Sequence, residues 1–133
     1  MRKPQKINNG EDMLGIGCDL ADVERIRNAI ARNGFKERVY TPEEIAYCTG
    51  AHGDKAQSYA ARFAAKEAFL KAIGTGLRGG QLTEISVSND EMGKPELKVT
   101  GYFATYIAKM GVKKIHLTLS HTNTTAMAVV ILE

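Results

Sequence analysis

The sequence has little of what marks exported, metal-binding or membrane-spanning proteins. Tryptophan is absent, and the 133 residues include only two cysteines. Cys18 and Cys48 do not have the spacing of a metal site, so we expect two reduced thiols. No apolar run approaches the roughly 20 residues of a membrane-spanning helix. The polar start of the chain shows no export signal. These absences predict a cytoplasmic protein without membrane contact.

The chain also lacks a large excess of either charge. Its formal net charge is +3, and it contains neither a block of lysines and arginines nor a basic run interleaved with aromatics. This pattern argues against nucleic-acid binding, although a mild positive charge permits an anionic partner. The hydrophobic content of 44% and the chain length suit one globular domain. We expect a flexible, polar lead-in over residues 1–12 and a single domain over residues 13–133.

The most informative segment is a helix predicted from about residue 57 to residue 73. Apolar positions run nearly all the way round it, which is typical of a buried helix. Four charged residues nevertheless interrupt the pattern. Glu67 and Lys71 are four residues apart and share one side of the helix, whereas Arg62 and Lys66 form a separate stripe. Because buried charge is costly unless it is paired or ligated, we expect this helix to line a site.

The rest of the chain predicts strands that follow one another as hairpins. We expect strands over 14–18, 84–88, 96–100, 115–120 and 126–132, and further helices starting near 21, 41 and 102. Consecutive hairpins, rather than strands alternating with helices, favour an α+β fold. The expected architecture is an antiparallel sheet packed against the long buried helix.

Two carboxylates are candidates for metal chemistry. Asp19 follows a glycine-rich strand and could simply cap the next helix. Glu67 could simply pair with Lys71 on the helix surface, at a gain of about 0.3–0.5 kcal/mol. Taken together, the two carboxylates suit Mg²⁺, which binds one or two carboxylates together with phosphate oxygens and waters. Lys71, Arg62 and Lys66 would then neutralise phosphate charge.

Two separated motifs resemble those of a known family. Gly-Ile-Gly-Cys-Asp at 15–19 and Arg-Phe-Ala-Ala-Lys-Glu-Ala-Phe-Leu-Lys at 62–71 are similar to the paired signature of the 4′-phosphopantetheinyl transferases. Within that superfamily the chain resembles the small, stand-alone holo-acyl-carrier-protein synthases. The likeness covers residues 13–133 and includes the turn at 89–95 and Ser-His-Thr at 120–122. The resemblance implies the fold of these transferases.

The resemblance also implies a role for individual residues. The two metal ligands of the family fall on Asp19 and Glu67, which would hold Mg²⁺ against the coenzyme A pyrophosphate. The motif lysine falls on Lys71, positioned for the phosphates, and Asp19, Glu67 and Lys71 form the implied catalytic set. Arg62 and Lys66 are implied to contact the phosphates or to support the site. Further implied coenzyme contacts are Gly74, His121 and Thr122.

The implied reaction is Mg²⁺-dependent transfer of 4′-phosphopantetheine from coenzyme A to a serine of an apo acyl carrier protein, in fatty acid biosynthesis. The serine hydroxyl attacks the β-phosphorus, 3′,5′-ADP leaves, and Glu67 or a metal-bound water is the candidate base. The first helix resembles a docking element in which Arg25 and Arg32 face an acidic carrier; a solvated helix face is the alternative reading. The family likeness implies a homotrimer with active sites at subunit interfaces.

Two other classes of function use similar residues. One is a different Mg²⁺-dependent phosphoesterase or nucleotidyl enzyme, because carboxylates and lysines serve those reactions as well. The other is a non-catalytic module that binds coenzyme A. Incubation with coenzyme A, Mg²⁺ and an apo carrier protein separates all three, because only the transferase adds mass to the carrier.

Overall fold

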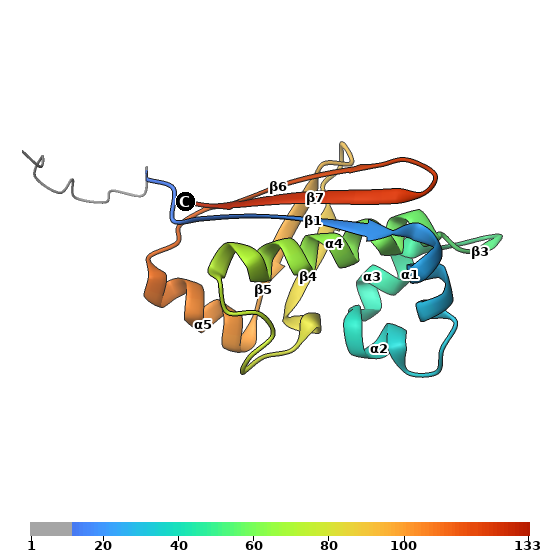
Figure 1. Ribbon diagram of the computed structural model, residues 1–133, viewed down its shortest axis with the longest axis horizontal. Coiled ribbons are helices and arrows are strands. Elements are labelled where there is room, and N and C mark those ends of the chain that lie inside the picture. Colours follow the sequence, from blue (N-terminus) through green and yellow to red (C-terminus); the bar gives the residue numbers. More distant parts are fainter. Residues whose placement is uncertain (1–11) are drawn as a thin grey trace, which may run out of the picture.

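Helix α4 (Ala56–Ile73) forms the middle of the fold, and the other elements pack around it (Figure 1). The computed structural model describes residues 12–133. A three-stranded sheet lies along one side of α4, and shorter helices lie toward both of its ends. Most residues of α4 are buried, as its apolar pattern predicts. The expected lead-in over residues 1–12 lies, except for its last residue, outside the described residues.

The three-stranded sheet is antiparallel throughout, with the strand order β1-β7-β6. Its strands are β1 (Gly15–Asp22), β6 (Ile115–His121) and β7 (Thr125–Leu132). The central strand β7 alternates strictly, because one face packs on α4. The buried residues of this face are Ala126, Ala128, Val130 and Leu132.

A second antiparallel pair consists of β4 (Ile85–Asn89) and β5 (Pro95–Val99). It follows a short 3-10 helix, η1 (Leu82–Glu84), and leads into α5 (Gly101–Met110).

The predicted α+β class, with an antiparallel sheet against a long buried helix, is confirmed. No helix in residues 12–133 combines the length and apolar character needed to cross a membrane. The remaining elements are α1 (Val23–Ile30), α2 (Phe35–Val39), α3 (Pro42–Cys48), β2 (Thr49–Gly50) and β3 (Gly53–Asp54).

The start of α1 differs from the prediction. Strand β1 continues to Asp22, and the helix begins at Val23 rather than near residue 21. The Asp22 side chain accepts a hydrogen bond from the backbone N–H of Glu24 at 2.9 Å. Asp22, and not Asp19, is therefore the helix cap. This leaves Asp19 inside the strand, with its carboxylate available for another purpose.

Two glycines allow β1 to lie directly on α4. A Cβ atom at Gly17 would collide with the backbone carbonyl oxygen of Ala68, and one at Gly15 would collide with that of Ala72. Because side chains alternate along a strand, Asp19 lies on the same face of β1 as the two glycines. The absence of side chains at 15 and 17 thus brings Asp19 close to the helix.

The opposite face of β1 carries apolar side chains that point away from α4. Ile16 is 58% exposed and Leu20 is 68% exposed. By register they pair with Ile131 and Met127 of β7, which belong to the same outer face. This outer face of the sheet, defined by these four residues, is an apolar surface without a partner among the described residues.

The contact between β1 and α4 predicts that Gly17→Ala is strongly destabilising. The added methyl group meets backbone atoms that cannot rotate away, so we expect a loss of about 3 kcal/mol in the free energy of unfolding. Urea unfolding followed by circular dichroism measures this loss. Gly50→Ala is the control, since the nearest atoms to its Cβ would be the flexible Lys55 side chain at 3.6 Å. Equal stability of the two variants would contradict the proposed constraint.

Candidate functional site

Asp19, Glu67 and Lys71 come together where β1 crosses the C-terminal half of α4. Lys71 Nζ donates a hydrogen bond to Asp19 Oδ1 at 2.9 Å. The Asp19 side chain is 16% exposed and that of Lys71 is 58% exposed. Glu67 lies one turn before Lys71 and is half-buried. Three of the predicted site residues are therefore neighbours, although the partner of Lys71 is Asp19 across the interface rather than Glu67 along the helix.

In this cluster two carboxylates, Asp19 and Glu67, lie near one ammonium group, that of Lys71. Burial raises the pKa of Glu67, the negative charge of Asp19 raises it further, and Lys71 opposes both effects. The hydrogen bond to Asp19 raises the pKa of Lys71. Glu67 and Asp19 are thus close enough to repel each other, and a second positive charge near them would relieve that repulsion.

A hollow of about 270 Å³ opens beside the cluster. The glycine of the helix C-cap, Gly74, adopts φ = 81° and donates its N–H to the carbonyl of Leu70. This left-handed turn directs the chain away from α4 and leaves the end of the helix open. The predicted contact residue Gly74 therefore lies beside the carboxylates. The hollow is lined by Glu67, Leu70, Lys71, Gly74 and Gly76.

The donor set of the cluster fits a hard divalent cation. Asp19 and Glu67 supply carboxylate oxygens, and within residues 12–133 no group of three or more His, Cys, Asp or Glu side chains is placed to hold a metal ion. Mg²⁺ characteristically takes one or two protein carboxylates and completes its octahedron with phosphate oxygens and waters. The two carboxylates beside an open hollow could hold Mg²⁺ in this way.

Arg62 lies on a different side of α4 from this cluster. Five residues separate it from Glu67, which corresponds to about 140° around the helix axis. Its guanidinium lies 4.0 Å from the centre of the Tyr47 ring, and its Nη2 donates to Asn89 Oδ1 at 2.6 Å. The side chain is buried, and its Nε has no hydrogen-bond partner among the described residues. Arg62 joins α3 and the end of β4 to α4, and in one chain it does not reach the Asp19 cluster.

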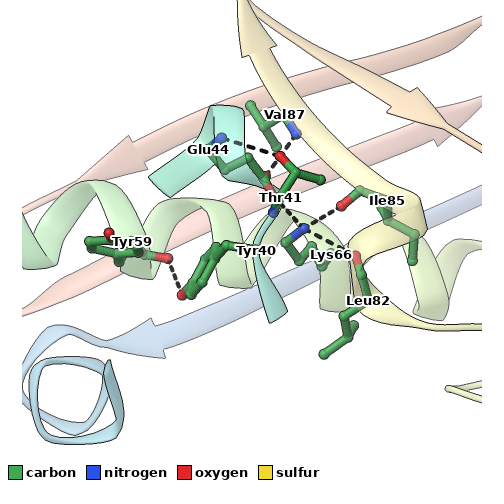
Figure 2. A network of polar contacts seen from close by, with 8 residues as sticks. All are labelled: Tyr40, Thr41, Glu44, Tyr59, Lys66, Leu82, Ile85 and Val87. Carbon is green, nitrogen blue, oxygen red and sulfur yellow. Dashed lines mark hydrogen bonds and ion pairs between the residues drawn. The ribbon is translucent and has the colours of Figure 1, made fainter. Parts of the chain in front are cut away.

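Lys66 is enclosed in the core and pairs with Glu44 of α3 (Figure 2). Its Nζ lies 2.8 Å from Glu44 Oε1 and also donates to the carbonyl oxygens of Leu82, at 3.1 Å, and Ile85. Both charged side chains have no exposed surface. Since all three N–H bonds of the ammonium are used, none is available for a phosphate. Of the two roles implied for Lys66, these contacts favour support of the site over contact with the phosphates.

His121 and Thr122 lie at the connection between β6 and β7, where both are exposed. This connection is held by Gln57, whose Nε2 donates to Asn123 Oδ1 at 3.1 Å and to the Thr122 carbonyl at 3.4 Å. Gln57 precedes Glu67 by ten residues, which is about 15 Å along the helix axis. In a single chain, these two predicted contact residues are thus separate from the Asp19 cluster.

Sequence reasoning did not identify the residues that hold the side chains of Arg62 and Lys66 in place. Glu44 stands three residues after Thr41, a spacing that suggests only a capping box at the start of α3, and the structure contains that box: Thr41 N donates to Glu44 Oε1, and Glu44 N donates to Thr41 Oγ1. The contacts of Tyr47 and Asn89 with Arg62 had no signal in the sequence. A carboxylate that completes a helix cap gives no indication that it also binds a lysine 22 residues away.

Comparison with known proteins gives a consistent result. The model of the 4′-phosphopantetheinyl transferase superfamily matches residues 15–130. A holo-[acyl-carrier-protein] synthase of Solibacter usitatus is 50% identical over 124 residues, and one of Geotalea daltonii is 45% identical over 124 residues. Each alignment covers 91% of this chain and 98% of the relative.

Solved structures agree with the sequence relatives. The crystal structure of the holo-[acyl-carrier-protein] synthase from Neisseria meningitidis superposes with a TM-score of 0.82 at 35% identity, covering 92% of this chain and 99% of that one. The synthase from Bacillus anthracis, solved in complex with CoA (3′,5′-ADP), gives a TM-score of 0.73 at 33% identity, covering 90% and 96%. The similarity extends over almost the whole of both chains.

The buried pair predicts an unequal response to single and double substitution. Lys66→Met leaves the Glu44 carboxylate buried without its partner, so we expect a loss of about 3–5 kcal/mol in the free energy of unfolding. Combining Lys66→Met with Glu44→Gln removes the unpaired charge and should recover part of this loss, while the carbonyls of Leu82 and Ile85 still lack their donor. Chemical unfolding of both variants provides the measurement. A double variant no more stable than Lys66→Met would contradict the assignment.

Proposed function

The chain belongs to the 4′-phosphopantetheinyl transferase superfamily, and on that basis we propose that it is a holo-acyl-carrier-protein synthase. It transfers 4′-phosphopantetheine from coenzyme A to a serine of an apo acyl carrier protein and releases 3′,5′-ADP. The observation that carries the proposal is the convergence of Asp19, Glu67 and Lys71 beside an open hollow. The same proposal places the reaction in the cytoplasm and in fatty acid biosynthesis.

We propose that Asp19 and Glu67 hold Mg²⁺, as the donor set of the cluster allows. When bound, the cation would neutralise negative charge on the coenzyme A pyrophosphate. Lys71 is largely exposed and has a flexible stem, so its ammonium is free to turn from Asp19 toward a phosphate oxygen. Gly74 leaves the backbone accessible at the same end of the hollow. Together these residues bind and orient the phosphates for in-line attack.

The attacking serine must lose its hydroxyl proton, and Glu67 is the acceptor that the cluster supports. A carboxylate that binds a cation through one oxygen keeps its second oxygen available to accept a hydrogen bond from the serine hydroxyl. The proton passes to a carboxylate oxygen of Glu67 directly or through a water molecule. Lys71 then balances the charge that develops on the transferred phosphoryl group.

We propose that the functional unit is a homotrimer with sites shared between subunits. The predicted coenzyme contacts fall into separate groups in one chain, because Arg62 and His121 lie away from the Asp19 cluster. A neighbouring chain that supplies the second group would complete the site. The apolar outer face of the sheet supports such an assembly, since exposed apolar patches mark protein contacts.

We propose that the acidic carrier docks on α1. Arg25 and Arg32 border a hollow of about 240 Å³ whose other walls include the apolar side chains of Ile26, Phe35 and Phe63. Two cations around an apolar hollow suit an acidic helix that presents one apolar side chain. The hollow also includes Ala21 of β1, which is two residues beyond Asp19 on the same face of the strand, so a carrier bound there lies beside the reacting groups.

The proposed reaction is tested by mixing the chain with coenzyme A, Mg²⁺ and an apo acyl carrier protein. We expect Asp19→Ala and Glu67→Ala each to lower the rate of transfer by about 10²–10³-fold. Each substitution removes a carboxylate proposed to hold the cation that stabilises negative charge in the transition state. Mass spectrometry of the carrier measures the transfer, and Glu43→Ala, on the exposed side of α3, serves as the control. Unchanged circular dichroism spectra verify the fold.

The outcomes of this assay separate the three classes of function. Mass gain of the carrier supports transfer. Release of 3′,5′-ADP without carrier labelling indicates a phosphoesterase, and coenzyme binding without turnover indicates a binding module. Full activity of either carboxylate variant would contradict the assigned metal ligands.

The proposed assembly predicts that Leu20→Glu breaks the trimer. A charge in the middle of the outer face would have to lose its water on association, so we expect the variant to be a monomer at micromolar concentration. Light scattering should give three times the chain mass for the unmodified protein. Thr105→Glu, on the exposed side of α5, is the control. An active monomer of the unmodified protein would contradict the shared site.

A further inference from the structure

Besides pairing with each other, Glu44 and Lys66 both form hydrogen bonds with the backbone of β4. Glu44 Oε2 accepts the backbone N–H of Val87 at 2.9 Å, and Lys66 Nζ donates to the carbonyl of Ile85. These groups lie on the edge of β4 that is not paired with β5. Buried backbone groups at a strand edge must find partners. The ion pair thus supplies the hydrogen bonds that a further strand would otherwise provide (Figure 2).

Lys66 also holds one end of a glycine-rich segment. Residues 74–81 read Gly-Thr-Gly-Leu-Arg-Gly-Gly-Gln, and the glycines at 74, 76 and 79 have positive φ. Such a segment has many accessible backbone conformations, because glycine tolerates most φ and ψ values. Its position therefore depends on the contacts that hold it: Gly79 and Gly80 pack against Tyr102 and Phe103 of α5, and the two ends are attached separately.

At each of its two ends, this segment is hydrogen-bonded to a residue of α4. At one end Gly74 N donates to the Leu70 carbonyl at 2.9 Å. At the other end Lys66 Nζ binds the carbonyl of Leu82, the residue that follows the segment. Gly74 and Gly76 line the hollow beside Glu67 and Lys71. The wall of the hollow is thus fixed at its far end by a residue that does not itself face the hollow.

We propose that Glu44 and Lys66 are a positioning pair for the coenzyme, which hold segment 74–81 in the conformation that forms the wall of its hollow. This inference rests on the proposed binding of coenzyme A in that hollow. According to this proposal, residues on two sides of α4 have different roles. Glu67 and Lys71 act on the phosphates, whereas Lys66, on another side of the helix, fixes the backbone that surrounds them. Loss of the pair should therefore weaken binding of the coenzyme more than it slows the chemical step.

The test uses the double variant Glu44→Gln/Lys66→Met, in which no buried charge is left unpaired. We expect its KM for coenzyme A to rise about tenfold, because segment 74–81 is no longer held at Leu82. We expect kcat to change by less than about threefold, because Asp19, Glu67 and Lys71 stay in place. Calorimetric titration with coenzyme A in Mg²⁺ should show the same loss of affinity, and amide hydrogen exchange over 75–81 should accelerate.

Thr41→Val is the matched control. It removes the hydroxyl that accepts Glu44 N and so weakens the start of α3, but it leaves every bond of Lys66 intact. We expect a lower melting temperature with an unchanged affinity for coenzyme A and unchanged exchange over 75–81. This control distinguishes the positioning of the segment from a general loss of stability.

Each outcome has a definite meaning. A double variant that binds coenzyme A as tightly as the unmodified chain would overturn the positioning role and leave the proposed function intact. No binding of coenzyme A by the unmodified chain would overturn the proposed function itself. If the double variant does not fold, hydrogen exchange of the unmodified chain without coenzyme A decides: amides over 75–81 that exchange more slowly than in an unstructured peptide support the proposal, and exchange as fast as in such a peptide overturns it.

Discussion

The close contact between β1 and α4 is the constraint on which the rest of this chain depends. Gly15 and Gly17 place no side chain between the first half of the strand and the helix backbone, so the two elements touch directly there. Asp19, two residues beyond Gly17, then lies within hydrogen-bond distance of Lys71. A larger separation would pull the carboxylate of the strand away from the carboxylate of the helix. The functional cluster is thus a consequence of how tightly two elements of the core pack.

Helix α4 is held from two directions by different physical means. On the side of the sheet, small residues and glycines allow close van der Waals contact. On the side of α3 and β4, Lys66 and Glu44 satisfy backbone groups that would otherwise be buried without partners. Taking two charges out of water is expensive, and the extra hydrogen bonds from both groups offset that cost. Packing fixes one side of the helix and polar bonds fix the other.

The sequence was sufficient to predict the fold class, the long helix and the grouping of Asp19 with Glu67. These features depend on local pattern and on two conspicuous motifs. It was insufficient for Lys66, because its partner Glu44 lies 22 residues away and was already explained as a helix cap. The orientation of β1 was also hidden, since alternation alone would turn Ile16 and Leu20 toward the core. They point outward because the helix backbone fills the space on the glycine side.

Strand β1 therefore has two faces with separate duties, the inner one for Asp19 and the outer one for apolar contacts. The period of a strand is two residues, so the insertion or loss of a single residue exchanges these faces. Asp19 would then point away from Glu67, while Leu20 would be driven against the backbone of α4. Length variation during evolution should consequently be tolerated in the loops of this chain but excluded from the eight residues of β1.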